Sequence, residues 1–183
     1  MSVRNGDPAH LTRRAMIGGL TAVTAGAGLA TPALARRSAI PKVDLRNPHT
    51  GEALRTEIVA NGRWVEEGLS DLSHFVRDWR EDVSMPIDRR VALILLKIRM
   101  ILEPREPTVI LSGYRTLKTN NRLHGAARNS LHLRAMALDI HQPGASLRDL
   151  HRAATALEDG GVGYYPRQSF VHVDCGRVRY WTS

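Results

Sequence analysis

Residues 136–141 read Met136-Ala-Leu-Asp-Ile-His141, in which large apolar side chains alternate with small or polar ones. This period of two is typical of a β-strand, and it places Leu138 and Ile140 on one face and Asp139 on the other. A second stretch, Phe170-Val-His-Val-Asp-Cys175, alternates in the same way, with His172 and Asp174 on one face. If the two strands are neighbours, Asp139 and His172 meet on one face of a sheet.

These two predicted strands and the segment before them carry potential metal ligands. His132 stands seven residues before Asp139, and seven extended residues would span ~23 Å, so the chain must bend between them. Two imidazoles and one carboxylate are a minimal ligand set for a catalytic zinc. Taken singly, Asp139 also fits a buried partner of an arginine, and His132 or His172 a hydrogen-bonded core residue. Together they favour a zinc site, since a carboxylate between apolar neighbours is costly to bury alone.

The rest of the sequence mixes strands and helices without a βαβ repeat. We therefore predict an α+β fold, in which a small antiparallel sheet carries the zinc site and packs against about three helices. Residues 47–52 and 166–169 predict hairpin turns, and 116–129 a loop with some helix. The predicted helices are 70–80, 89–103 and 146–158, and the predicted strands are 43–45, 55–59, 63–65, 109–111, 136–141, 163–165 and 170–174.

The first 35 residues have the composition of an export signal. Arg13 and Arg14 form an arginine pair, and an uncharged stretch rich in Ala, Gly, Thr and Leu follows and ends in Ala33-Leu-Ala35. The pair is typical of the twin-arginine route, and the ending has the form of a cleavage site. We predict a twin-arginine signal peptide at 1–35 and a single domain at 36–183 that acts in the periplasm. There are two alternatives. One is a cytosolic protein with an Ala/Gly-rich tail, and the other is an exported protein whose signal stays uncleaved as an anchor.

The net charge of the predicted domain indicates which kind of partner it binds. Removal of residues 1–35 takes away three arginines and one aspartate and lowers the formal net charge from +8 to +6. A modestly basic exported domain suits an anionic partner such as cell wall. Nucleic acid is a poor partner, because the basic residues are scattered and only 5% of the chain is aromatic.

The single cysteine, Cys175, excludes an internal disulfide framework and is expected in the core. We expect a monomer with no stable membrane span after signal cleavage.

Several motifs occur in an order that resembles a known family. The pattern Ser130-x-His132-x-x-Ala135-x-Ala137-x-Asp139, followed by His172, is similar to the zinc D-Ala-D-Ala peptidases of the lysostaphin, VanX and hedgehog-domain group. More closely, the chain resembles the twin-arginine-exported murein endopeptidases of the endopeptidase K type. This resemblance implies that His132, Asp139 and His172 bind zinc and that the protein hydrolyses peptide cross-links in peptidoglycan. The motifs that carry it are Ser112-Gly-Tyr-Arg115, Thr119-Asn120, Gly160-Gly-Val-Gly-Tyr-Tyr-Pro166 and Phe170-Val-His-Val-Asp174.

The chain departs from the wider group where that group has catalytic residues. Many members have a histidine in the place of Phe170, others have a glutamate in the place of Ser169, and glycine is usual at Ala135. The histidine and glutamate serve as general base or stabilise the transition state, so the base is open here. Asp174 is predicted either as this base or as the carboxylate that orients the His172 ring, a common partner of metal-bound histidines. Weaker candidates for the base are His141 and His124.

Arg115 follows a buried strand and a Ser-Gly-Tyr turn, a position at the rim of a cleft. Its planar guanidinium suits the free carboxylates of stem peptides, so we predict a catalytic or substrate-binding role, with a surface salt bridge as the alternative. Tyr164 and Tyr165 either flank substrate, donate to an oxyanion or pack in the core. The predicted function is a zinc-dependent murein endopeptidase. The alternatives are a non-catalytic zinc-containing peptidoglycan-binding module and a carboxypeptidase that removes terminal D-Ala.

Overall fold

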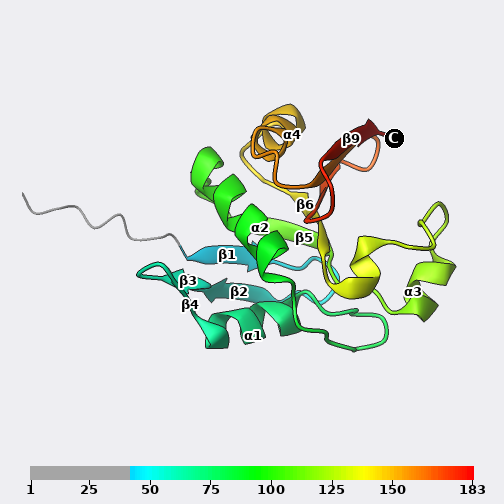
Figure 1. Ribbon diagram of the computed structural model, residues 1–183, viewed down its shortest axis with the longest axis horizontal. Helices are drawn as coiled ribbons and strands as arrows, with labels where there is room; N and C mark the ends of the chain where they lie inside the picture. The colour runs from blue at the N-terminus through cyan, green and yellow to red at the C-terminus, as the bar shows by residue number, and fades with distance from the viewer. Residues whose placement is uncertain (1–41) are drawn as a thin grey trace, which may run out of the picture. The chain divides into compact units, whose positions relative to one another are not determined.

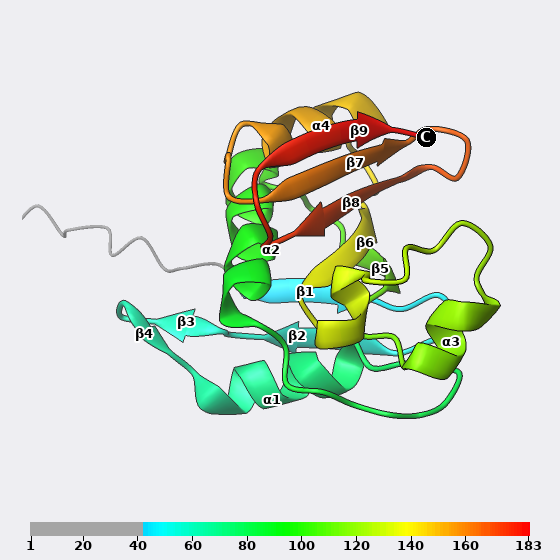
Figure 2. The same ribbon diagram turned by 45° about the vertical axis from the view of Figure 1, so that its right-hand side comes forward.

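The computed structural model describes residues 42–183, and the predicted signal peptide lies outside the described residues. Within them the chain forms a seven-stranded sheet in the order β2-β1-β5-β6-β8-β7-β9 and a two-stranded hairpin, β3-β4 (Figures 1 and 2). Together with the helices, these sheets confirm the predicted α+β class. The strands are β1 (Val43–Arg46), β2 (Ala53–Thr56), β3 (Val59–Ala60), β4 (Arg63–Trp64), β5 (Thr108–Ser112), β6 (Ala137–His141), β7 (Gly161–Tyr165), β8 (Phe170–Asp174) and β9 (Arg179–Thr182).

Most neighbouring strands of the large sheet run antiparallel, as predicted, but two pairs run parallel. These are β1 with β5 and β7 with β9, so the sheet is mixed. The strand β9 was not predicted, because it lies at the sheet edge and neither of its faces is fully buried. The predicted hairpin of β7 and β8 is confirmed. The single strand predicted at 55–59 is divided between β2 and β3.

Helices begin and end where the sequence supplies caps. The Asp88 carboxylate accepts a hydrogen bond from the Arg90 N–H at 2.8 Å at the start of α2, and Ser146 Oγ accepts one from the Asp149 N–H at 3.1 Å at the start of α4. Among residues 42–183, no helix is both long and apolar enough to span a bilayer. The helices are α1 (Glu66–Phe75), α2 (Arg89–Leu102), α3 (Leu117–Arg122), α4 (Leu147–Thr155) and the 3-10 helix η1 (Leu131–Arg134).

The helix α1 begins and ends earlier than the predicted range of 70–80. The chain leaves the helix at Val76, whose carbonyl accepts a hydrogen bond from the Tyr114 N–H at 2.8 Å, and Asp78 then pairs with Val83 in a β-bridge. Trp79 continues the helical spacing in the sequence but stacks on His49, with ring centroids 4.5 Å apart. The apolar spacing therefore extends from the helix into a loop that packs against another part of the chain.

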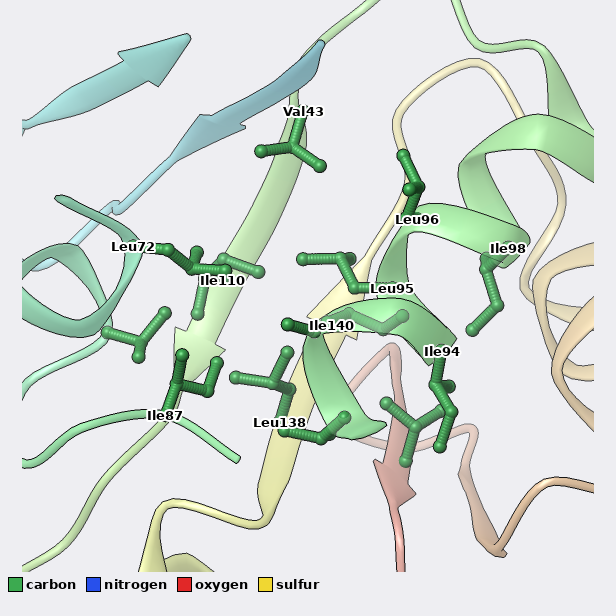
Figure 3. Packing of buried hydrophobic residues seen from close by; sticks show 14 of the residues in the cluster. Val43, Leu72, Ile87, Ile94, Leu95, Leu96, Ile98, Ile110, Leu138 and Ile140 are labelled. Atoms are coloured by element: carbon green, nitrogen blue, oxygen red, sulfur yellow. The ribbon is translucent and has the colours of Figure 1, made fainter. Parts of the chain in front are cut away.

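The hydrophobic core lies between one face of the large sheet and the helix α2. Leu138 and Ile140 of β6 point toward Leu95 and Ile94 of α2, and all four side chains are buried (Figure 3). The period-two alternation of β6 therefore turns Asp139 to the opposite face of the sheet. His172 of the neighbouring strand lies on that same face, directly opposite Asp139.

Candidate metal centre

Three polar side chains converge on the sheet face away from α2. As predicted, β6 and β8 are neighbours, and Asp139 lies directly opposite His172. His132 comes from η1, where Ser130 caps the helix. The bend that the sequence required is made at Ala135, which adopts a left-handed φ of 51° and ends η1 just before β6. This conformation accounts for the usual glycine at that position, and here it accommodates a methyl group.

Hydrogen bonds behind the two imidazoles fix which ring nitrogens carry protons. His132 Nδ1 lies 2.6 Å from the Gly113 carbonyl oxygen, and His172 Nε2 lies 3.0 Å from Asp174 Oδ2. Both oxygens can only accept, so these two nitrogens are protonated. In the neutral form of each ring, the other nitrogens, His132 Nε2 and His172 Nδ1, therefore turn lone pairs toward Asp139.

Three atoms that carry lone pairs and, in the neutral rings, no proton lie close together: His132 Nε2, His172 Nδ1 and Asp139 Oδ1. His172 Nδ1 is 2.9 Å from Asp139 Oδ1, and His132 Nε2 is 3.3 Å from both of these atoms. Lone pairs at such distances repel one another unless a positive charge lies between them. Within residues 42–183 this is the one group of three or more His, Cys, Asp or Glu side chains with metal-binding spacing. The residues fit a metal ion with a further position open to water or substrate.

The pKa shifts describe a centre that attracts positive charge. Burial lowers the pKa of His132, which favours its neutral, metal-binding form. Burial acts to raise the pKa of Asp139, but His132 and His172 hold it well below its usual range, so Asp139 is a carboxylate at neutral pH. Burial acts to lower the pKa of His172, yet hydrogen bonds with Asp139 and Asp174 raise it overall. A cation bound here replaces the extra proton that His172 would otherwise hold.

Asp174 is completely buried, and both of its oxygens are occupied. Oδ2 accepts hydrogen bonds from the His172 ring at 3.0 Å and from Arg179 at 2.7 Å. Oδ1 accepts from Arg179 at 3.0 Å and from the Gly161 and Gly176 N–H groups at 3.3 and 2.9 Å. Burial opposes ionisation, but His172 and Arg179 hold the pKa of Asp174 below its usual range. This arrangement favours the orienting role over that of a general base.

Arg115 contacts Asp139 of this cluster rather than standing free at a rim. Its guanidinium donates to Asp139 Oδ2 and, at 2.7 Å, to Ser112 Oγ, and its backbone N–H donates to the His132 carbonyl at 3.0 Å. Burial lowers the pKa of Arg115, and the charge of Asp139 acts against that shift. Arg115 thus holds one oxygen of Asp139 and leaves Oδ1 turned toward the two imidazoles.

The remaining sequence candidates lie outside the cluster. His141 bonds the Ser169 carbonyl at 2.9 Å, and His124 is exposed in the loop after α3. Cys175 is in the core, as predicted, where burial raises its thiol pKa to about 11. None of the three faces the converging lone pairs of His132, Asp139 and His172.

Two residues of β9, a strand that was not predicted from the sequence, reach the centre. Trp181 lies beside Gly163 of β7, where a Cβ atom would stand 2.5 Å from the indole Cε2. The missing side chain lets the indole lie over β7, with its centroid 5.3 Å from that of His172. Arg179 crosses Gly161 in the same way, where a Cβ would stand 2.2 Å from Nη1. The available signal was the Gly161-Val-Gly163 alternation, since glycine inside a strand often marks a close approach.

Trp181 also fixes the hydroxyl of Tyr165. The indole Nε1–H donates to Tyr165 Oη at 3.0 Å, and the Tyr165 ring stacks on Phe170 with centroids 4.4 Å apart. Tyr165 and Gly163 are two residues apart on β7, so Tyr165 lies on the same sheet face as His172. Because an indole can only donate, Tyr165 Oη is the acceptor in this bond and its own proton is free for another partner.

A mixed sheet that carries a buried cluster of two histidines and one aspartate fits the class of metal-dependent hydrolases. Comparison with known proteins gives the particular family. Residues 36–181 match the model of the family described as peptidoglycan L,D-endopeptidase MepK, and the chain belongs to that family.

The similarity to two named relatives covers most of the chain. The chain is 38% identical to the peptidoglycan L,D-endopeptidase MepK of Escherichia coli strain K12 over 182 residues, which cover 96% of this chain and 100% of that protein. It is 33% identical to the probable peptidoglycan L,D-endopeptidase MepK of Haemophilus influenzae over 141 residues, which cover 74% of this chain and 76% of that protein. The family predicted from the sequence motifs is thereby confirmed.

Proposed function

We propose that this protein is a zinc-dependent endopeptidase that hydrolyses peptide cross-links in peptidoglycan, and that it cleaves an L,D bond as the names of its relatives state. The observation that carries the proposal is the convergence of three lone pairs from His132 Nε2, His172 Nδ1 and Asp139 Oδ1. Two imidazoles, one carboxylate and an open position are the ligand set of a catalytic zinc. Bound there, Zn²⁺ supplies Lewis acidity and an activated water.

The protein's own residues prepare the centre for this chemistry. Gly113 and Asp174 hold the protons of the two imidazoles on the far side of each ring. Arg115 binds the second oxygen of Asp139 and is a positioning residue. Tyr165, whose oxygen is held by Trp181, turns its O–H to the substrate carbonyl and stabilises the negative charge that develops on that oxygen.

The test is digestion of purified peptidoglycan, followed by mass spectrometry of the released muropeptides. The parent protein with Zn²⁺ should release peptides cut at the L,D cross-link, chelator should abolish the products, and His132→Ala should yield none. His124→Ala, which alters an exposed histidine outside the cluster, is the matched control. A protein that stays on murein without forming products would instead be the binding module, and release of free D-Ala alone would indicate a carboxypeptidase.

We also propose that the protein works in the periplasm as a monomer and is exported by the twin-arginine route. The arginine pair at Arg13 and Arg14 and a substrate in the cell wall support this location. Replacing both arginines with lysine should leave the precursor in the cytoplasmic fraction. Light scattering of the purified protein tests the monomer.

A further inference from the structure

The loop after α1 runs beside the turn that carries Arg115. The Tyr114 N–H donates to the Val76 carbonyl at 2.8 Å. Asp78 Oδ2 accepts hydrogen bonds from both the N–H and the hydroxyl of Thr116, each at 2.9 Å. The other oxygen of Asp78 accepts the Arg80 N–H at 3.1 Å. One buried carboxylate therefore fixes the backbone of Arg80 relative to residues 114–116, next to the metal centre.

The side chain of Arg80 is held in place by a stack of aromatic rings. Its Cζ lies 4.1 Å from the centroid of the Trp79 ring, and the Trp79 ring also stacks on His49, whose plane is inclined by 13° to that of Trp79. His49 Nε2 is anchored to the Leu111 carbonyl at 3.1 Å. A guanidinium held over an indole loses less side-chain freedom when it binds an anion.

The acidic residues near Arg80 are all engaged elsewhere. Glu81 accepts Lys118 at 2.6 Å and Arg122 at 3.2 Å, and Asp82 accepts Arg77 at 2.6 Å. Within residues 42–183 the exposed Arg80 guanidinium makes no ion pair. Arg80 is thus an exposed cation whose backbone is fixed, through Asp78, next to the turn that carries Arg115, and it has no acidic partner among residues 42–183.

We propose that Arg80, stacked on Trp79, is a substrate-binding residue that receives a free carboxylate of the stem peptide beside the cleaved bond. The inference rests on the proposed endopeptidase function. Arg115 suits this role less well, because its Nε and Nη2 already donate to Ser112 and Asp139. A planar guanidinium can bind a carboxylate through two parallel hydrogen bonds.

Two cross-linked stem peptides that differ at one group test the assignment. One carries a free carboxylate on the residue beside the scissile bond, and the other carries a carboxamide there. The parent should cleave the carboxylate peptide with a kcat/KM about tenfold higher, mainly through KM, which is the size of a charge-assisted hydrogen bond. Arg80→Gln should lose this preference, and Arg80→Lys should keep part of it. Arg63→Gln, at an exposed position of the separate hairpin β3-β4, should behave as the parent.

Binding without turnover separates this inference from the proposed function. Titration calorimetry with the His132→Ala protein should show tighter binding of the carboxylate peptide than of the carboxamide. In the double variant that carries both His132→Ala and Arg80→Gln, the affinities for the carboxylate and carboxamide peptides should be equal. Equal affinities in the presence of Arg80 would overturn the inference, even if the parent cleaves both peptides. A clear calorimetric preference would support it, even if the parent cleaves neither and the proposed function fails.

Discussion

At the scale of single residues, the proton positions of two histidines decide what the centre can bind. His132 gives its proton to a backbone carbonyl and His172 gives its proton to Asp174, so the remaining nitrogens face Asp139 with lone pairs. A carbonyl cannot lose this role by titration or by most substitutions, whereas Asp174 is a side chain and can be replaced. Asp174 is therefore the residue at which metal affinity can be tested without removing a ligand.

We expect Asp174→Asn to bind Zn²⁺ about 10- to 100-fold more weakly, the usual effect of losing a carboxylate behind a ligating histidine. The amide keeps the size of the side chain but loses its charge toward His172 and Arg179. Competition with a chromophoric chelator measures the affinity. Asp159→Asn, which removes an aspartate from an exposed ion pair with Lys97, is the control. An unchanged affinity would show that Asp174 does not tune His172.

Tyr165→Phe tests the proposed donor to the oxyanion. The change removes one hydroxyl and leaves the ring stacked on Phe170. We expect kcat to fall by about 10²- to 10³-fold, as when one oxyanion donor is lost, with KM and bound zinc unchanged. Steady-state kinetics and metal analysis provide the two readouts. Tyr180→Phe, at a tyrosine that is half exposed, should retain full activity, and equal kcat values for the two variants would exclude the role of Tyr165.

At the scale of elements, two glycines of the strand β7 allow side chains of its neighbour β9 to lie across it. Gly161 and Gly163 face the same side as His172, and their bare backbones allow Arg179 and Trp181 of β9 to reach side chains on β8. The sheet thus brings residues from strands that are two positions apart into one centre. A side chain at either glycine would fill the space that makes this possible.

Gly163→Ala should disturb this arrangement directly. The new methyl group would stand 2.5 Å from Trp181 Cε2, so the indole must move. We expect a loss of about 1–3 kcal/mol in the free energy of unfolding, as for other overpacked sites, together with a change in tryptophan fluorescence. Urea denaturation followed by fluorescence measures both. A variant with parental stability and spectrum would mean that Trp181 does not rest on Gly163.

Sequence patterns predicted those elements whose side chains alternate between core and site. Leu138 and Ile140 are buried on one side of β6 and Asp139 lies on the other, so alternation predicted that Asp139 and His172 share one sheet face if β6 and β8 are neighbours, as they are. In β9 no such contrast exists, and Trp181 and Arg179 gain their positions from a neighbouring strand. Arg115 was predicted near the site, but its partner Asp139 lies 24 residues away and no local pattern encodes that contact.

At the scale of the whole molecule, buried Asp78 joins the first half of the described chain to the loop before α3. Its oxygens bind the Arg80 and Thr116 backbones, which belong to segments far apart in sequence. Burial acts to raise the pKa of Asp78, but the nearby Thr119 hydroxyl and the hydrogen bonds from Thr116 and Arg80 outweigh it, and the pKa is lowered. The helical spacing of 70–80 could not predict this role, because the same residues fit a longer helix equally well.

This shift makes stability depend on pH in acid. In the folded protein the pKa of Asp78 lies below its unfolded value of about 3.9, so its contribution is complete above that pH. The contribution is lost as the pH falls through the folded pKa. In chelator, the parent should therefore lose unfolding free energy below about pH 4, and Asp78→Asn should lose less over the same range. Urea denaturation at several pH values, with the exposed-site variant Asp71→Asn as control, measures the difference. Identical pH profiles for the parent and Asp78→Asn would contradict the assignment.

The position of β9 at the sheet border has a consequence for how firmly the surroundings of the centre are held. A border strand is held by one neighbour only, and such strands open more readily than central ones. Detachment of β9 would withdraw Trp181 and Arg179 together, while His132, Asp139 and His172 would keep their places on η1, β6 and β8. The three converging side chains would stay in place, but Tyr165 and Asp174 would lose hydrogen bonds that orient them. Fraying of a strand that supplies none of these three side chains would thus loosen their surroundings without dispersing them.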